Sequence, residues 1–152
     1  MTRLAPADKA DYRFFHQVRI RWAEVDAQGI VFNAQYFFLF DVGMTEFFRH
    51  VGLPAGMADQ GGRGEMFTAA SACNYHAPAH FDDLVDIGVR LKTLGRSSLT
   101  MAVGIWRGDT LLSTGEMVYV YANPETRTAE PIPQAFRAIL QDLAPEAVAP
   151  GA

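Results

Sequence analysis

The sequence predicts an α+β domain in which an antiparallel sheet of five strands is wrapped around one long central helix. Three observations lead to this class. Residues 34–51 are apolar on nearly every face of a helix, four segments after them alternate apolar and polar residues, and one segment before them does the same. A chain of 152 residues is long enough for one domain. We therefore expect a single domain over residues 1–152, with its core at about residues 14–143.

The composition excludes several classes of protein. The chain is 49% hydrophobic and 20% charged, which is ordinary for a globular protein. A formal net charge of -4 and a pI near 5.5 argue against nucleic acid as a partner, because nucleic acid is usually bound by a basic face. Cys73 is the single cysteine, so we expect a buried packing residue without a disulfide, and residues 1–18 lack the apolar core of a secretion signal. A cytoplasmic protein with no membrane partner is expected.

The strands are predicted from alternation of apolar and polar residues at a period of two. This alternation is found at residues 14–22, 66–76, 85–106 and 111–121. The third segment is a hairpin of two strands, since Gly95, Arg96 and Ser97 supply a turn. Gly108 supplies the next turn, so the Arg-Gly-Asp sequence there needs no adhesive role. The open edges of such a sheet favour pairing with a second copy, and a homodimer or a dimer of dimers is expected.

Two helices are predicted. The central one begins after Asn33, a favoured N-cap residue, and ends at Gly52, with Pro54 just beyond it. Polar residues interrupt its apolar run, which excludes a membrane span of about 20 apolar residues. The second helix starts near Pro133 and carries an apolar stripe at i, i+3, i+4 and i+7. The stripe consists of Phe136, Ile139, Leu140 and Leu143. The tail at residues 145–152 is expected to be disordered.

The principal candidate for chemistry is Asp26, which precedes Gly29 and the predicted helix start at Asn33. A carboxylate near a helix N-terminus is favoured in its charged form by the free backbone N–H groups and by the macrodipole. The same donors can polarise a substrate carbonyl and hold the oxyanion that forms when it is attacked. The competing interpretation is a simple D-x-x-G turn, in which the aspartate bonds to its own backbone and the glycine has a positive φ.

Other titratable residues are expected to have smaller roles. Glu24 lies on the same face as Asp26 if the first strand continues, and a nearby pair of carboxylates can raise one pKa, although we favour a solvated Glu24. His76 and His80 are four residues apart, a spacing that can bind metal on a helix. Pro78 between them breaks such a helix, so no metal is expected.

Two blocks of sequence resemble a known family. DAQGIVFNAQY at residues 26–36 is similar to the signature of hotdog-fold acyl-CoA thioesterases of the 4-hydroxybenzoyl-CoA thioesterase type, where it joins the first strand to the central helix. YHAPAHFDDL at residues 75–84 resembles the family's aromatic-x-x-Pro-Ala-x-aromatic-Asp-Asp-Leu pattern. With Gly95, Arg96 and Ser98 on the hairpin, the resemblance covers roughly residues 14–121.

The resemblance implies a hotdog fold and the hydrolysis of an acyl-CoA to a free acid and CoA, without a metal or redox cofactor. It implies that Asp26 is the catalytic carboxylate, as nucleophile or general base, with Gly29 in the same motif. The backbone N–H of Asn33 matches the position that the family directs at the thioester carbonyl. Arg96, with Ser98 beside it, matches a basic hairpin position that contacts the phosphates of CoA.

Two other functions stay open beside this one. An acyl-carrier-protein thioesterase is the nearest alternative within the enzymes, and a hotdog module that binds acyl-CoA without cleaving it is the alternative outside them. The sequence does not specify the acyl group. Residues 57–67 are expected to contribute to its pocket.

Overall fold

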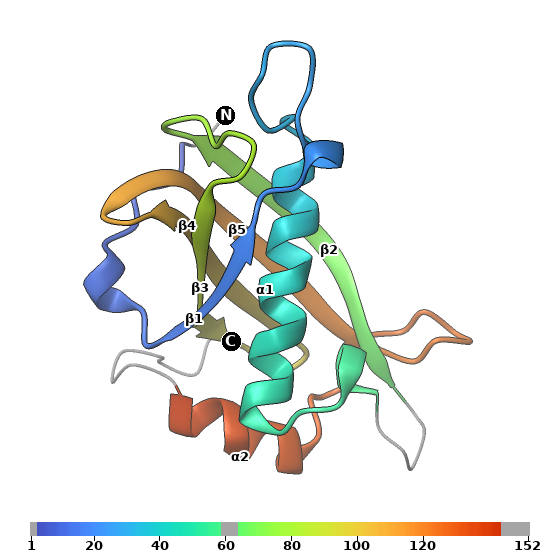
Figure 1. Ribbon diagram of the computed structural model, residues 1–152. Coiled ribbons are helices and arrows are strands. Elements are labelled where there is room, and N and C mark those ends of the chain that lie inside the picture. The colour runs from blue at the N-terminus through green and yellow to red at the C-terminus, as the bar shows by residue number, and fades with distance from the viewer. Residues whose placement is uncertain (1–2, 59–63, 144–152) are drawn as a thin grey trace.

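The computed structural model of the protein describes residues 3–58 and 64–143. The strands in this part of the chain are β1 (Phe14–Arg19), β2 (Glu65–Tyr75), β3 (Leu84–Leu94), β4 (Ser98–Arg107) and β5 (Thr110–Ala122). They form one antiparallel sheet in the order β1-β3-β4-β5-β2. Helix α1 (Gln35–Val51) lies across one face of the sheet, and helix α2 (Gln134–Leu143) lies at one end of it (Figure 1). The predicted fold class is confirmed.

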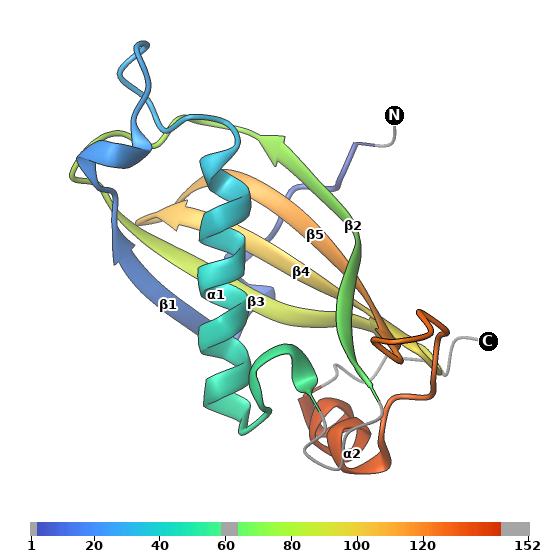
Figure 2. The same ribbon diagram turned by 90° about the vertical axis from the view of Figure 1, so that its right-hand side faces the viewer.

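Helix α1 packs on the sheet through one side only. Phe40 and Met44 are enclosed there, and Gly43 lets the helix approach Ile87 of β3 so closely that an added Cβ would clash. On the opposite side Phe38 is 66% exposed. The prediction that the helix is enclosed on nearly every face is therefore wrong for that side, because one curved sheet covers only the half of a helix that it faces (Figure 2).

The first strand ends earlier than predicted. It stops at Arg19, and Trp22 begins a 3-10 turn in which it is 77% exposed. Glu24 explains the difference: its carboxylate accepts the Arg21 N–H at 2.7 Å and pairs with the Arg21 guanidinium at 2.9 Å. With the Glu24 N–H donating to the Arg21 carbonyl at 3.0 Å, these contacts stabilise a turn, so the apolar residue at position 22 does not continue the strand.

The remaining strands and turns agree with the sequence analysis. Strand β2 spans 65–75 where 66–76 was predicted, and the chain turns between β3 and β4 at residues 95–97. Gly108 has a φ of +58° in the turn between β4 and β5, a conformation that glycine adopts without strain. Strands β1 and β2 form the two edges of the sheet.

The short helix α2 closes the core at the end where α1 stops. The carbonyl of Pro133 accepts the N–H groups of residues 136 and 137 at 3.0 and 2.9 Å, so the proline lies at the helix start as predicted. Leu140 is fully buried, whereas Leu143 at the end of the stripe is 40% exposed. The predicted disordered tail lies outside the described residues. No helix in the described ranges is long and apolar enough to cross a membrane.

Candidate active site

The two sequence blocks that carry the family resemblance meet at one end of the molecule, where α1 begins (Figure 1). The Val31 N–H donates to the Ala79 carbonyl at 2.9 Å, and the Ala79 N–H donates to the Tyr36 hydroxyl oxygen at 3.2 Å. The Tyr75 hydroxyl donates to the Asn33 carbonyl at 2.9 Å, and the rings of Tyr36 and Tyr75 meet edge to face at 5.1 Å. The second block therefore holds the helix start that the first block builds.

Asp26 lies half-buried in a tight loop before that helix start. Its Oδ1 accepts the Gln28 N–H at 2.8 Å, and its own N–H donates to the Ile30 carbonyl at 2.9 Å. Gly29 has a φ of +76°. The simple turn that the sequence allowed is therefore present, but it uses only one oxygen of the carboxylate. Within the described residues, Oδ2 has no hydrogen-bond partner and remains available for chemistry.

The first turn of α1 is tighter than an α-helical turn. The N–H groups of residues 35, 36 and 37 donate to the carbonyls three residues earlier, at 2.9, 3.4 and 3.2 Å. The N-cap is Ala34 and no side chain caps the helix, so the predicted capping role of the Asn33 side chain is wrong. In the part of the chain that the structure describes, the N–H groups of Asn33 and Ala34 have no acceptor. These two consecutive donors are what the helix start offers to a substrate.

Glu24 has neither of its expected roles. It is 7% exposed rather than solvated, and the strand that would have placed it on the same face as Asp26 has already ended. Its carboxylate holds Arg21, while its carbonyl accepts the Phe32 N–H at 2.9 Å. Glu24 therefore ties the two ends of the Asp26 loop together.

Asp83 and Arg107 form a second clamp that sequence reasoning missed. Arg107 Nη1 donates to Asp83 Oδ2 at 2.7 Å and to the Pro78 carbonyl at 3.1 Å, and the His80 N–H donates to the same Oδ2 at 2.9 Å. Partial burial alone would raise the pKa of the Asp83 carboxyl, but these hydrogen bonds and the Arg107 charge hold that pKa below its usual range. The two residues lie 24 positions apart, on different elements, so no local sequence pattern predicts the pair.

Cys73 and His76 lie on or beside β2 near the same end. Cys73 is half-buried against the core, and burial raises the pKa of its thiol to about 11, so the thiol is neutral at ordinary pH. His76 Nε2 lies 2.9 Å from the Thr114 hydroxyl oxygen. Among the described residues, no group of three or more His, Cys, Asp and Glu side chains is placed to hold a metal ion.

Arg96 lies at the opposite end of the molecule, in the exposed turn between β3 and β4. Its carbonyl accepts the Ile132 N–H at 2.9 Å and an Arg137 Nη2 hydrogen at 3.0 Å, and Ser98 closes the turn by accepting the Gly95 N–H at 2.7 Å. A cavity of about 620 Å³ lies between this turn and the start of α2. Two arginines, Arg96 and Arg137, line it.

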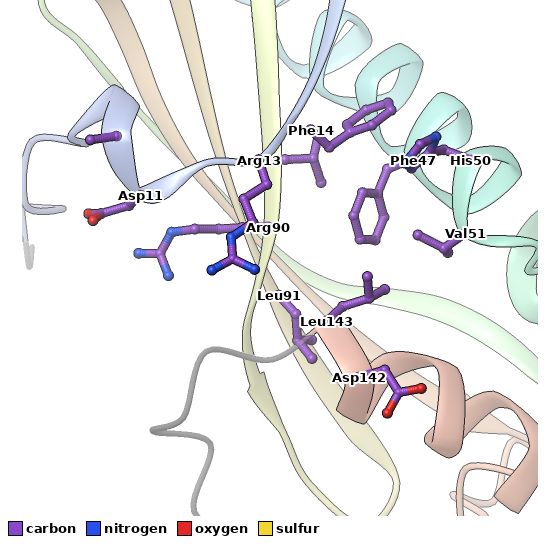
Figure 3. A pocket seen from close by; sticks show the side chains of 12 residues that line it. Asp11, Arg13, Phe14, Phe47, His50, Val51, Arg90, Leu91, Asp142 and Leu143 are labelled. Carbon is purple, nitrogen blue, oxygen red and sulfur yellow. The ribbon is translucent and has the colours of Figure 1, made fainter.

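One chain does not bring Asp26 and Arg96 together. Strand β3 runs between their two ends with 11 residues, or roughly 35 Å at about 3.3 Å per residue. A further cavity of about 670 Å³ also lies at the distal end, against the last turn of α1 (Figure 3). Its lining mixes Arg13 and Arg90 with Asp11 and Asp142 around apolar side chains, so it favours no single charge. We therefore take the Asp26 end as the candidate active site, on its chemistry rather than on cavity volume.

Comparisons with known proteins identify the family of the chain. The sequence profile of the thioesterase superfamily matches residues 28–114, which is more than half of the chain, so the chain belongs to the thioesterase superfamily. The acyl-CoA thioester hydrolase YbgC of Escherichia coli O6:H1 is 27% identical over 122 residues, covering 78% of this chain and 89% of that protein.

Solved structures show the same architecture. A 1,4-dihydroxy-2-naphthoyl-CoA thioesterase from Synechocystis superposes with a TM-score of 0.79 at 18% identity, over 87% of this chain and 98% of that one. The PA5185 protein from Pseudomonas aeruginosa strain PAO1 superposes with a TM-score of 0.78 at 27% identity, over 91% and 96% of the two chains. The fold is the hotdog fold, and the class of the protein is thioester hydrolase.

Proposed function

We propose that the chain hydrolyses acyl-CoA thioesters to a free acid and CoA. The observation that carries this proposal is the arrangement at the start of α1. There, a loop presents one open carboxylate oxygen of Asp26, and two consecutive backbone N–H groups, of Asn33 and Ala34, lack acceptors among the described residues. The name of the Escherichia coli relative, an acyl-CoA thioester hydrolase, supports the choice of CoA thioesters over other thioesters.

In the proposed reaction the thioester carbonyl oxygen faces the N–H of Asn33. As a general base, Asp26 takes a proton from water while the water oxygen bonds to the carbonyl carbon, and the C=O electron pair becomes an oxyanion that the N–H stabilises. Collapse of the oxyanion breaks the C–S bond, and the proton passes to the departing CoA sulfur. As a nucleophile, Asp26 would instead attack the carbonyl carbon and release CoA, leaving a mixed anhydride. Water would then hydrolyse this anhydride to the free acid and restore Asp26. Both roles stay within the proposal.

The proposal includes a second copy of the chain, because Asp26 and Arg96 lie at opposite ends of one molecule. Strand β2 is an edge strand, and its residues 68–72 are all exposed. Antiparallel pairing of two β2 edges about a two-fold axis would place the start of one α1 at the same level as the β3–β4 turn of the partner. Arg96 of the partner subunit, with Ser98 beside it, would then contact the CoA phosphates in a homodimer or a dimer of dimers.

The acyl group is the open part of the proposal. The two motif blocks resemble the 4-hydroxybenzoyl-CoA thioesterase type, so aromatic acyl groups belong among the candidates. Met57, in the segment expected to contribute to the acyl pocket, is fully buried, and residues 59–63 of that segment lie outside the described residues. The proposed catalysis needs no metal or redox cofactor.

A panel of aliphatic and aromatic acyl-CoA thioesters, assayed for free thiol, tests the proposal. We expect turnover of at least one class, with the matching acyl-carrier-protein thioesters turned over much more slowly. Preference for carrier-protein thioesters would favour the acyl-carrier-protein thioesterase. Binding of acyl-CoA without any release of thiol would instead favour the non-catalytic module. Light scattering that shows an active monomer at micromolar concentration would exclude the shared site.

A further inference from the structure

The Tyr75 hydroxyl controls a peptide group at the proposed reaction site. It donates to the carbonyl of Asn33 at 2.9 Å. In a trans peptide the carbonyl and the following N–H point in opposite directions, so fixing this carbonyl also fixes the direction of the Ala34 N–H. That N–H has no acceptor among the described residues. By holding the Asn33 carbonyl, Tyr75 therefore sets the direction of the Ala34 N–H without contacting it.

The other bond to this carbonyl is weaker. The Tyr36 N–H donates to it at 3.4 Å, beyond the usual 2.7–3.2 Å range of such bonds. The preceding peptide is held differently, because its Phe32 carbonyl accepts the Gln35 N–H at 2.9 Å. The first turn of the helix therefore orients the Asn33 N–H by itself, whereas the Ala34 N–H depends on Tyr75.

Tyr75 is itself held in place. It is the last residue of β2, opposite Ser113 of β5, and its ring meets the ring of Tyr36 edge to face at 5.1 Å. Partial burial, with the neighbouring Cys73 and Tyr36, raises the pKa of the Tyr75 phenol to about 12. The hydroxyl thus keeps its proton, and remains a donor, at any pH at which the enzyme is assayed.

We propose that Tyr75 is a positioning residue for thioester hydrolysis. By holding the peptide between Asn33 and Ala34, it makes the Ala34 N–H a second donor to the oxyanion beside the Asn33 N–H. This inference rests on the proposed function. Two successive backbone N–H groups form a concave donor site for an anion, and preorganised donors of this kind are worth much of the rate of acyl transfer.

Substitution Tyr75→Phe tests the proposal, because it removes the hydroxyl and keeps the ring that packs on Tyr36. We expect kcat to fall about tenfold at unchanged KM, since a displaced donor weakens the transition state rather than substrate binding. Tyr119→Phe is the matched control. The Tyr119 hydroxyl makes no hydrogen bond within the described residues, and Tyr119 lies six positions further along β5 than Ser113. The kcat and KM of this variant are therefore expected to stay at wild-type values.

A second variant tests the donor directly. Replacing Ala34 by lactic acid through semisynthesis turns the Asn33–Ala34 amide into an ester. This removes the Ala34 N–H and keeps the Asn33 carbonyl group. We expect at least the same loss of kcat, and less than about a twofold further loss when Tyr75→Phe is added, because both changes remove one interaction. The ester also tests the Ala34 donor should the Tyr75→Phe variant not fold.

The outcomes separate this inference from the function on which it rests. Wild-type kcat in Tyr75→Phe, together with loss of activity in Asp26→Asn, would overturn the positioning role and leave the function standing. Activity in Asp26→Asn at the wild-type level would overturn the function itself. A raised KM at unchanged kcat in Tyr75→Phe would mean that the hydroxyl contacts substrate, and multiplicative losses in the double variant would mean that it acts apart from Ala34. Either result would overturn the positioning role.

Discussion

The two ends of helix α1 differ in how they are built. At its start, loops from two sequence blocks are tied together by hydrogen bonds, and the available groups are one carboxylate oxygen and two backbone donors. At the opposite end, one cavity is lined by Arg96 and Arg137, and a second mixes two arginines with two aspartates. Rigid donors suit bond breaking, whereas open, basic surfaces suit binding of a charged group. Under the proposed function, chemistry belongs to the start of α1 and CoA binding to the opposite end, which would place the two in different subunits.

The largest expected effect is at the start of the helix. Asp26→Asn should keep the turn, because the amide oxygen can still accept the Gln28 N–H, but it removes the proton acceptor or nucleophile. We expect kcat to fall by at least about a hundredfold, and further if the carboxylate is the nucleophile. The free-thiol assay measures the loss, and circular dichroism with acyl-CoA binding confirms a folded variant. Near-normal turnover would place the chemistry elsewhere.

The end of the helix is tested by Arg96→Glu. KM for acyl-CoA should rise about tenfold at low salt with little change in kcat, because the phosphate contact is remote from the bond that breaks. The effect should shrink at high salt, which screens exposed charges. Arg13→Glu is the matched control: it makes the same charge change at an exposed arginine of the other distal cavity. An equal rise in KM in the two variants would mean that Arg96 contributes only through the net charge of the protein.

Mixing the two defects tests whether the ends meet across an interface. Co-expressed Asp26→Asn and Arg96→Glu chains should recover about a quarter of wild-type activity, since half of randomly paired two-fold dimers are mixed and each mixed dimer has one intact site. The assay is run below KM, where both defects are visible. If Asp26 and Arg96 of the same chain acted together, every site would carry one defect and nothing would be recovered.

The Asp83 clamp is expected to affect stability more than chemistry. Asp83→Asn should lower the free energy of unfolding at neutral pH by about 1–2 kcal/mol, because hydrogen bonds to a charged acceptor are lost. The pKa of the Asp83 carboxyl is depressed in the folded protein, so its contribution is present above the unfolded pKa and is lost as the pH falls through the folded pKa. Urea unfolding at several pH values checks this. A difference between the two proteins that does not shrink in acid would contradict it.

The smallest expected effect is that of Asn33→Ala. The side chain is exposed and caps nothing, and the backbone N–H is retained in the variant. We expect a change of unfolding free energy below about 0.5 kcal/mol, as for other surface substitutions, and a kcat within about twofold of wild type. A loss larger than that of Asp26→Asn, at equal folding, would assign the side-chain amide a direct contact with substrate or water.

Predictability from sequence differed between local and distant features. The strands and hairpins followed from alternation, and the turns at Gly29, Gly52 and Gly108 followed from the one residue that adopts a positive φ without strain. The start of α1 was missed by one residue, because Asn33 is a good cap in general but here lies in a turn held by Tyr75. The exposed position of Trp22 was missed because the Arg21–Glu24 turn overrides alternation.

The sequence by itself determined the order of the elements, the long helix, the two motif blocks and the residue types of the site, because each depends on periodicity or on neighbours within a few positions. Only the tertiary structure decided which residues of distant segments contact one another. Tyr75 is 42 positions from the carbonyl that it holds, and Arg107 is 24 from Asp83. Nothing in a local pattern encodes such pairings. They arise when the sheet aligns β2 and β4 beside the start of α1, and that alignment also separates Asp26 from Arg96.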